Sequence, residues 1–267
     1  MKKIIALLLV TVFLSVALTS CVPIIRYSFG DLGQDTSSNN NTNTETPLPD
    51  DTTETLINVV APRLLRANVV ITATHYTFVQ QASSQGSGVV FHTDARYVYI
   101  LTNHHVVYQE DVKRSVYTVR DAFNNTYSAI VVAMNEECDL AVVRIARSET
   151  TDNLNVATIA TANAPVDTPV IAVGNPEGVH NTVSVGKIVY VKDITNDTLS
   201  VDVAYHTAPL EHGSSGGGIF DSEGRLVGIN YAVGADSETG NEMSFAVPVA
   251  AIRDFLSANN LLPTTAD

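Results

Sequence analysis

A glycine-rich stretch that contains two serines, Gly213-Ser214-Ser215-Gly216-Gly217, constrains this chain most strongly. Glycines at a tight turn allow backbone angles that other residues avoid, so a serine hydroxyl between them can stand exposed beside free N–H groups. Such a serine is a candidate nucleophile. The same composition also occurs in ordinary hairpin loops, so the stretch alone does not separate a catalytic turn from a structural one.

The residues that could assist this nucleophile all precede it in the chain. The histidine pair His104 and His105 comes first, Asp139 follows, and no histidine comes after His212. The α/β-hydrolase arrangement needs its acid and its histidine after the serine, so it is excluded. The order histidine, aspartate, serine is that of another known catalytic triad, and it favours an enzyme over a structural loop.

Acyl transfer by serine needs a base, a carboxylate that orients the base, and donors for the developing oxyanion. The histidine pair ends an apolar run, and an imidazole with a pKa of about 6.5 suits neutral pH. Asp139 opens the apolar run Leu140–Ile145, and a carboxylate buried there needs a partner such as a histidine Nδ1–H. Taken singly, Asp139 could be a turn residue and the histidines an ordinary polar pair in a loop.

Short runs rich in β-branched and aromatic residues predict an all-β fold. The first set spans about residues 69–146 and predicts barrel one; the second spans about 165–248 and predicts barrel two. Helical spacing predicts a short helix from Leu56 toward Asn68 and a C-terminal helix over 249–262. The predicted strands are Val69–Thr74, Gly88–His92, Tyr97–Thr102, Ser115–Val119, Tyr127–Met134, Leu140–Ile145, Pro169–Val173, Val183–Val191, Leu199–Ala204, Gly217–Phe220, Leu226–Tyr231 and Met243–Val247.

The first 55 residues have the pattern of an export signal and a tether. Lys2 and Lys3 precede the apolar run Ile4–Leu18, which is short for a transmembrane helix. Leu18-Thr19-Ser20-Cys21 resembles the bacterial lipobox, which implies that residues 1–20 are a lipoprotein signal peptide and that Cys21 carries the lipid; a simple secretory signal is the alternative. We expect a disordered polar tether over 21–55, a folded domain over 56–262, and a lipid-anchored location on the extracytoplasmic face of a bacterial envelope.

Charge and composition exclude several other classes. The formal net charge of −13 argues against nucleic acid as a partner and against electrostatic binding to anionic lipid. No metal-binding motif is present, so we expect neither metal nor cofactor. With Cys21 used for lipid, Cys138 remains a lone thiol beside an apolar run and is expected to be a buried small hydrophobe.

Four segments in this order, T-N-x-H-V (from Thr102), D-L-A-V (from Asp139), V-G-N-P (from Val173) and G-x-S-G-G (from Gly213), resemble the trypsin-like serine proteases. They are most similar to the bacterial HtrA/Deg branch. The resemblance runs from about Leu56 to Leu262 and includes Gly86-Ser87-Gly88 and Ser244–Pro248. It implies a chymotrypsin-like pair of packed six-stranded antiparallel barrels.

The resemblance implies a role for each motif residue. His105, not His104, would be the base, Asp139 the orienting acid and Ser215 the nucleophile. The N–H groups of Gly213 and Ser215 would form the oxyanion hole. The primary substrate pocket would be lined by Pro209, Gly228, Ile229 and Asn230. None of these carries a charge, so we expect cleavage of polypeptides after small or medium aliphatic side chains.

Two departures from the HtrA/Deg pattern leave alternatives open. Thr207 stands where the branch usually has Asp, and Glu211-His212 where it has Asn-Pro, which puts the geometry of the loop before the serine in doubt; Gly218 in place of Pro or Ala is a milder change. The branch usually adds a PDZ domain, and we expect a form without it. A catalytically inactive or activator-dependent surface binding protein is the alternative function, an esterase is a third, and a homo-oligomer is left open.

Overall fold

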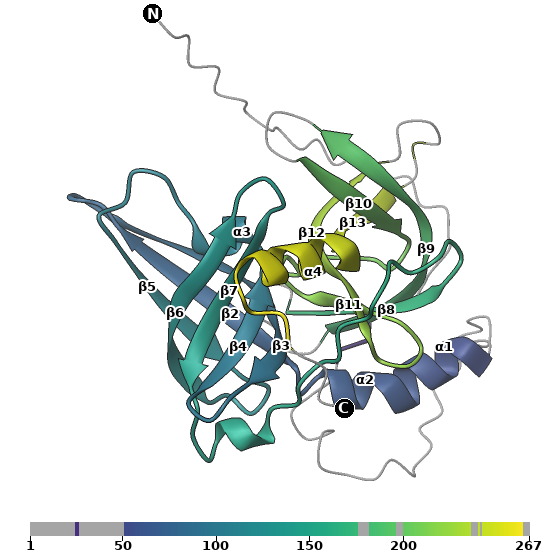
Figure 1. The fold of residues 1–267 in the computed structure, drawn as a ribbon, viewed down its shortest axis with the longest axis horizontal. Coiled ribbons are helices and arrows are strands. Elements are labelled where there is room, and N and C mark those ends of the chain that lie inside the picture. Colours follow the sequence, from purple (N-terminus) through teal and green to yellow (C-terminus); the bar gives the residue numbers. More distant parts are fainter. Residues whose placement is uncertain are drawn as a thin grey trace, which may run out of the picture.

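The protein folds into two closed six-stranded antiparallel barrels with few helices, which confirms the predicted fold class (Figure 1). The structure is a computed structural model, and it describes residues 25–26, 51–175, 182–195, 200–235, 240 and 242–263. The predicted signal peptide 1–20 and Cys21 lie outside the described residues.

Barrel one closes in the order β2-β3-β4-β7-β6-β5, with β5 returning to β2. Its interior is filled by aliphatic side chains that alternate along the strands, such as Val69 and Ile71 of β2 and Ile100 of β4. The strands are β2 (Asn68–Tyr76), β3 (Gln81–Thr93), β4 (Tyr97–Thr102), β5 (Arg114–Arg120), β6 (Thr126–Asn135) and β7 (Leu140–Ala146).

Barrel two closes in the order β9-β10-β13-β12-β11-β8, and β8 pairs back with β9. The two-residue strand β1 (Ile25–Arg26) adds to β9, with Ile25 opposite Val183. This pairing falls within the segment expected to be a tether and was not predicted. The strands of the barrel are β8 (Pro169–Gly174), β9 (Thr182–Thr195), β10 (Ser200–His206), β11 (Gly218–Phe220), β12 (Leu226–Ala235) and β13 (Glu242–Pro248).

All the predicted strands occur, and the largest difference is the length of β3. This strand begins at Gln81 rather than at Gly88, because its polar first half pairs residue by residue with β2 as far as Tyr76. That half is mostly exposed and carries no apolar alternation, so the sequence pattern could not indicate it.

Helices lie at both ends of the described domain. A helical segment of α1 (Asp51–Thr55), η2 (Leu56–Val60) and α2 (Ala61–Leu64) begins five residues before the predicted start of the domain. The C-terminal helix α4 (Val249–Ala258) ends before the predicted Leu262 and packs against β12 and β13. Two short helices are α3 (His104–Val107) and η3 (Thr151–Asn153). Within the described ranges, no helix has the length and apolar character needed to cross a bilayer.

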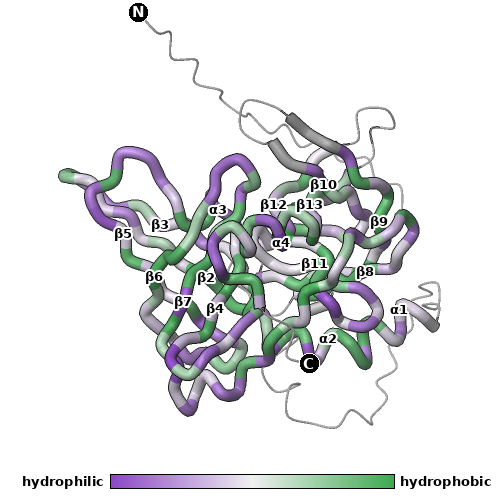
Figure 2. The backbone as a smooth tube through the Cα atoms, in the orientation of Figure 1, coloured by the Kyte–Doolittle hydropathy of each residue, from purple (hydrophilic) through white to green (hydrophobic). Residues whose placement is uncertain are grey.

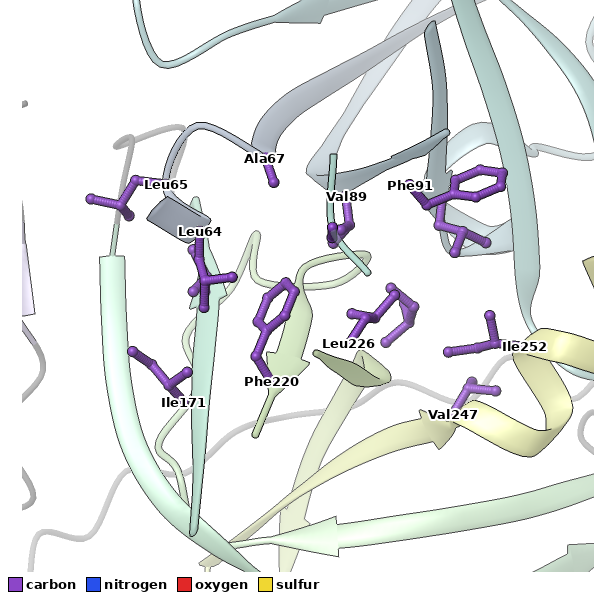
Figure 3. Packing of buried hydrophobic residues seen from close by; sticks show 14 of the residues in the cluster. Leu64, Leu65, Ala67, Val89, Phe91, Ile171, Phe220, Leu226, Val247 and Ile252 are labelled. Atoms are coloured by element: carbon purple, nitrogen blue, oxygen red, sulfur yellow. The ribbon is translucent and has the colours of Figure 1, made fainter. Parts of the chain in front are cut away.

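The largest hydrophobic cluster lies between the barrels rather than inside either one. Hydrophobic residues follow the strands and hydrophilic residues follow the connecting loops (Figure 2). Figure 3 shows how Val89 and Phe91 of barrel one meet Phe220 and Leu226 of barrel two, with Leu64 and Ile252 from the two terminal helices. This shared core fixes the two barrels relative to each other, and the candidate site lies between elements of both.

Candidate active site

His105 and Asp139 form a hydrogen-bonded pair at one end of barrel one. The ring Nδ1 of His105 lies 2.8 Å from Oδ2 of Asp139, and the backbone N–H of His105 donates to Oδ1 at 3.0 Å. A carboxylate only accepts hydrogen bonds, so Nδ1 carries the proton and Nε2 is left as the acceptor. The His105 side chain is 48% exposed and that of Asp139 only 10%, so the imidazole reaches solvent while the carboxylate is buried.

Local structure holds this pair in place. His105 lies in the single turn α3 that follows β4 directly, and the side chain of Asn103, just before α3, donates to the carbonyl oxygen of Asp139 at 2.9 Å. Asp139 has a φ of +49°, a left-handed conformation that aspartate and asparagine tolerate better than most residues. Its N–H closes a turn onto Glu136 at 3.1 Å, so the carboxylate projects at the mouth of β7.

The glycine-rich stretch 213–217 forms a turn immediately before β11, and its hydrogen bonds leave two N–H groups free. Ser214 donates to Glu211, Gly216 to Asn230 and Gly217 to the carbonyl of Ser214. In the described part of the chain, no acceptor takes the N–H of Gly213 or of Ser215. Both of these residues are half-buried and reach solvent. Free N–H groups at a turn are the donors that an oxyanion hole requires.

Gly213 and Gly216 have φ values of +97° and +84°. A Cβ at Gly216 would lie 2.1 Å from the carbonyl oxygen of Ser87 and 2.4 Å from Oγ1 of Thr102, so no side chain fits there. The turn therefore needs glycine both for its backbone angles and for its close approach to barrel one.

Ser215 lies close to the histidine helix, although its hydroxyl points elsewhere. Gly86 lies between Ser215 and Val106 of this helix. A Cβ on Gly86 would lie 2.6 Å from a methyl of Val106 and 2.9 Å from the carbonyl oxygen of Ser215. The Oγ of Ser215 donates to the carbonyl of Tyr231 at 3.3 Å. Within the described residues, Ser215 Oγ has no hydrogen bond to His105. The structure thus brings the three predicted triad positions into one region, with the His105 imidazole paired to the Asp139 carboxylate and the Ser215 hydroxyl turned toward β12.

The residues predicted for the substrate pocket lie on barrel two. Pro209 is half-buried, and its carbonyl accepts a hydrogen bond from Ser184 Oγ at 2.6 Å. Ile229 is fully buried in the core between the barrels, and β12 is paired with β11 and with β13 at this position. Asn230 is also fully buried, and its Oδ1 lies 3.0 Å from Nε2 of His206. The pocket itself stays a prediction.

Burial shifts the pKa of several groups around the nucleophile turn. It lowers the pKa of His206 to about 4, against a smaller opposing effect of the Asn230 hydrogen bond. It raises the pKa of Tyr231 to about 12, with the charges of Tyr205 and Asp139 adding to the effect. It also raises the pKa of Cys138 to about 11, so this thiol stays protonated and weakly nucleophilic beside Asp139.

Three residues at the site had no role in the sequence analysis: Ser87, Asn175 and Tyr231. Ser87 and Asn175 belong to motif segments that the sequence did indicate, but their contacts are with residues far away in the chain. Tyr231 contributes a backbone carbonyl, which no residue pattern reports. Over the described residues, no group of three or more His, Cys, Asp or Glu side chains is arranged to hold a metal ion.

Residues 86–229 match the trypsin-like peptidase domain family, which covers more than half of the chain. Among curated proteins, HhoA of Synechocystis sp. is 34% identical over 197 residues, a match that covers 69% of this chain and 46% of HhoA. The serine protease Do-like HtrA of Lactococcus lactis subsp. cremoris is 30% identical over 181 residues, covering 63% of this chain and 43% of the relative. The matched region thus spans less than half the length of these relatives.

A solved structure of an HtrA-type protease, AlgW with a tripeptide, superposes with a TM-score of 0.60 at 26% identity. The superposition covers 74% of this chain and 62% of that one. These relatives agree with the predicted HtrA/Deg resemblance.

Proposed function

The chain belongs to the trypsin-like peptidase domain family, and we propose that it is a serine endopeptidase that cleaves exposed or unfolded polypeptide through an acyl-enzyme at Ser215. One observation carries the proposal: a His105–Asp139 pair with its proton on Nδ1 lies beside a serine turn that has two free N–H groups. A loop with a purely structural role needs neither the paired base nor the unused donors.

In the proposed reaction, Ser215 Oγ turns from the Tyr231 carbonyl to His105 and attacks the peptide carbonyl carbon. Nε2 of His105 takes the hydroxyl proton and gives it to the leaving amine nitrogen, which breaks the peptide bond and leaves an ester on Ser215. Water then attacks the ester while Nε2 takes its proton, and Nε2 gives this proton to Ser215 Oγ as the ester bond breaks and the acid leaves. Asp139 keeps the proton of His105 on Nδ1 and stabilises the imidazolium that forms in each step.

The N–H groups of Gly213 and Ser215 would bind the oxyanion of each tetrahedral intermediate. One such donor typically contributes about 3 kcal/mol to lowering the barrier. Gly213 and Ser215 are adjacent to the buried Ser214, so the two donors lie on neighbouring parts of one short turn.

We also propose that the primary pocket lies in the uncharged surroundings of Pro209, bounded by Gly228, Ile229 and Asn230 of β12, and that it prefers small or medium aliphatic side chains. The lipobox-like segment at Cys21 supports a lipid-anchored location on the extracytoplasmic side of a bacterial envelope, where the enzyme would act in protein quality control or processing.

One observation supports a second candidate function, that of an activator-dependent protease or an inactive surface binding protein. The Ser215 hydroxyl donates to Tyr231 and not to His105, so the nucleophile is not yet activated. The loop before the serine is nevertheless well held: Thr207 exchanges hydrogen bonds with Lys187, and Ser244 Oγ donates to Ala208 at 2.8 Å. Catalytic hydrogen bonds often form only when substrate binds, and this favours the enzyme.

Labelling with a fluorophosphonate serine-hydrolase probe tests the proposal, with intact mass as the readout. We expect a single adduct on the wild-type chain, none on Ser215→Ala, and labelling slowed by about 10⁴-fold in His105→Ala. Two neighbours serve as matched controls, since Ser214→Ala and His104→Ala should both keep the adduct. A folded wild-type chain that never reacts would favour the binding protein, and an adduct that appears only after peptide is added would favour the activator-dependent form.

A further inference from the structure

A set of buried polar side chains lies behind the nucleophile turn, and the proposed mechanism does not use it. Asn68 on β2, Ser87 on β3 and Asn175 just after β8 are 2%, 0% and 0% exposed. Burying polar groups is unfavourable unless they are hydrogen-bonded. The three are linked: Asn68 Nδ2 donates to Asn175 Oδ1 at 3.0 Å, and Asn175 donates to Ser87.

Ser87 is the centre of this network, and it reaches both residues of the proposed oxyanion hole. Its hydroxyl donates to the carbonyl of Gly213 at 2.8 Å, across 126 positions of the chain. Its backbone N–H donates to the carbonyl of Ser215 at 2.7 Å. The carbonyls of the two residues that supply the free N–H groups are therefore both held by one residue of the other barrel.

The partners of Ser87 also determine where its hydroxyl proton points. The backbone N–H of Asn175 donates to Ser87 Oγ at 2.8 Å, and its Nδ2 lies 3.3 Å from the same oxygen. Because both Asn175 groups donate, the single proton of the hydroxyl is available for Gly213. Thr102 Oγ1 fixes the Ser87 backbone from the other side by donating to its carbonyl at 2.8 Å.

We propose that Ser87 is a positioning residue for the oxyanion hole: it fixes the Gly213–Ser214 and Ser215–Gly216 peptide units. These two units flank the unit that carries the Ser215 N–H, and the first also adjoins the unit that carries the Gly213 N–H, so both N–H groups are held facing the substrate carbonyl. The inference rests on the proposed function, because it needs a reaction that forms an oxyanion. It makes the oxyanion hole depend on the docking of barrel one against barrel two, since β3 reaches the turn only when the barrels are packed together.

The test compares a peptidyl oxygen ester with its thionoester on the full chain, using Ser87→Ala. A thiocarbonyl sulfur accepts hydrogen bonds poorly, so the wild-type preference for the oxygen ester measures how well the oxyanion hole works. We expect kcat for the oxygen ester to fall by about 10- to 100-fold, with KM changed by less than about twofold, and the oxygen-to-sulfur preference to fall in parallel.

A matched control lies on the same strand. Ser84 Oγ also donates to a backbone carbonyl, that of Val106 at 2.9 Å, but this contact is with helix α3 and not with Gly213 or Ser215. Ser84→Ala should therefore leave the oxygen-to-sulfur preference unchanged. If Ser87→Ala does not fold, Ser87→Cys keeps the shape with a weak donor and should lose the same preference, while Ser87→Thr keeps the hydroxyl and should restore it.

The outcomes separate the two proposals. A wild type that hydrolyses the ester, together with a folded Ser87→Ala that keeps the full oxygen-to-sulfur preference, would overturn the role of Ser87 and leave the peptidase intact. A folded wild type that neither hydrolyses the ester nor takes the fluorophosphonate would overturn the proposed function, and the role of Ser87 with it.

Discussion

The two sides of the candidate site are built in different ways. The base side, which holds the proposed base His105, belongs to barrel one alone: His105, Asp139 and Asn103 hold one another through hydrogen bonds between α3 and the start of β7. The nucleophile side belongs to barrel two, yet two carbonyls of its turn are held by Ser87 of barrel one.

It follows that one part of the site can form before the two barrels pack together. The base needs only local structure, so its geometry should survive changes elsewhere in the molecule. The geometry of the nucleophile turn depends on its own glycines, on the backbone of Asn230 and on the contact from β3. A change at any of these should therefore alter that geometry.

The largest expected effect comes from breaking the base side. In Asp139→Asn, the amide can donate to His105 Nδ1, which favours the tautomer with its proton on Nε2, the wrong nitrogen for a base. We expect kcat to fall by about 10⁴-fold with a small change in the unfolding temperature. Steady-state kinetics and thermal unfolding measure the two quantities. A fall of less than about tenfold would show that Asp139 is not the orienting acid.

Gly216→Ala should break the nucleophile side through sterics alone. The added methyl would overlap the Ser87 carbonyl, and the positive φ adds backbone strain, so we expect the free energy of unfolding to fall by about 3 kcal/mol and fluorophosphonate labelling by at least about 100-fold. Gly240→Ala is the matched control, because Gly240 has a φ of +70° and no described atom within 4 Å of the added carbon. It should cost only about 1 kcal/mol and leave labelling unchanged; equal losses in the two variants would contradict the steric account.

Acid should destabilise the nucleophile side by protonating His206. This histidine contacts Asn230, whose backbone forms hydrogen bonds with Gly216 and Gly217. Its pKa of about 4 lies below the ordinary histidine value of 6.5, so the unfolded chain takes up the proton first and stability falls as the pH drops from about 6.5 to 4. Between pH 7 and 4.5, we expect this group to account for roughly 2 kcal/mol of lost stability.

His206→Gln isolates this effect, since glutamine keeps a donor for Asn230 and does not titrate. Urea unfolding at pH 7 and 4.5 should show a smaller drop in the variant than in the wild type. His75 in barrel one also has a pKa lowered by burial, and it contributes equally to both proteins. Identical pH dependence in the two proteins would rule out His206 as an acid-sensitive group.

The smallest effect concerns Cys138, which adjoins Asp139 on the base side. With a pKa of about 11 against an ordinary value of 9.0, its thiol should react with iodoacetamide at pH 8 about 100-fold more slowly in the folded chain than after unfolding. Peptide mapping distinguishes it from Cys21. Cys138→Ala should leave kcat unchanged, and a rapid native reaction that abolishes activity would place this thiol closer to the chemistry than its burial indicates.

Strand positions were predictable where burial imposes a pattern. β4 has the predicted bounds Tyr97–Thr102. All of its residues except the first are buried, so the strand appears in the sequence as a short apolar run with clear ends. The first half of β3 and the pairing of β1 with β9 were not predictable. Both depend on a neighbouring strand rather than on an apolar face.

The residue types of the site and their order were predictable from the sequence. The hydrogen bonds that hold these residues in place were not. The order of His105, Asp139 and Ser215 indicated the chemistry, and the structure brings all three into one region. The Ser87 contact joins residues 126 positions apart, and Asn175 reaches Val69 across 106 positions, so no local pattern could show either. The direction of the Ser215 hydroxyl depends on a backbone carbonyl of β12, which any residue there would provide.

The place of β13 in barrel two has a consequence for when this chain gains activity during its synthesis. Residues 242–248 fill the gap between β10 and β12, so barrel two cannot close until nearly the whole described domain has left the ribosome. Barrel one, complete by Ala146, can by then have paired its histidine and aspartate. In the proposed endopeptidase, a nascent chain would therefore carry an assembled His105–Asp139 pair without a seated Ser215, and it would be unable to cut itself or its neighbours before its last strand is in place.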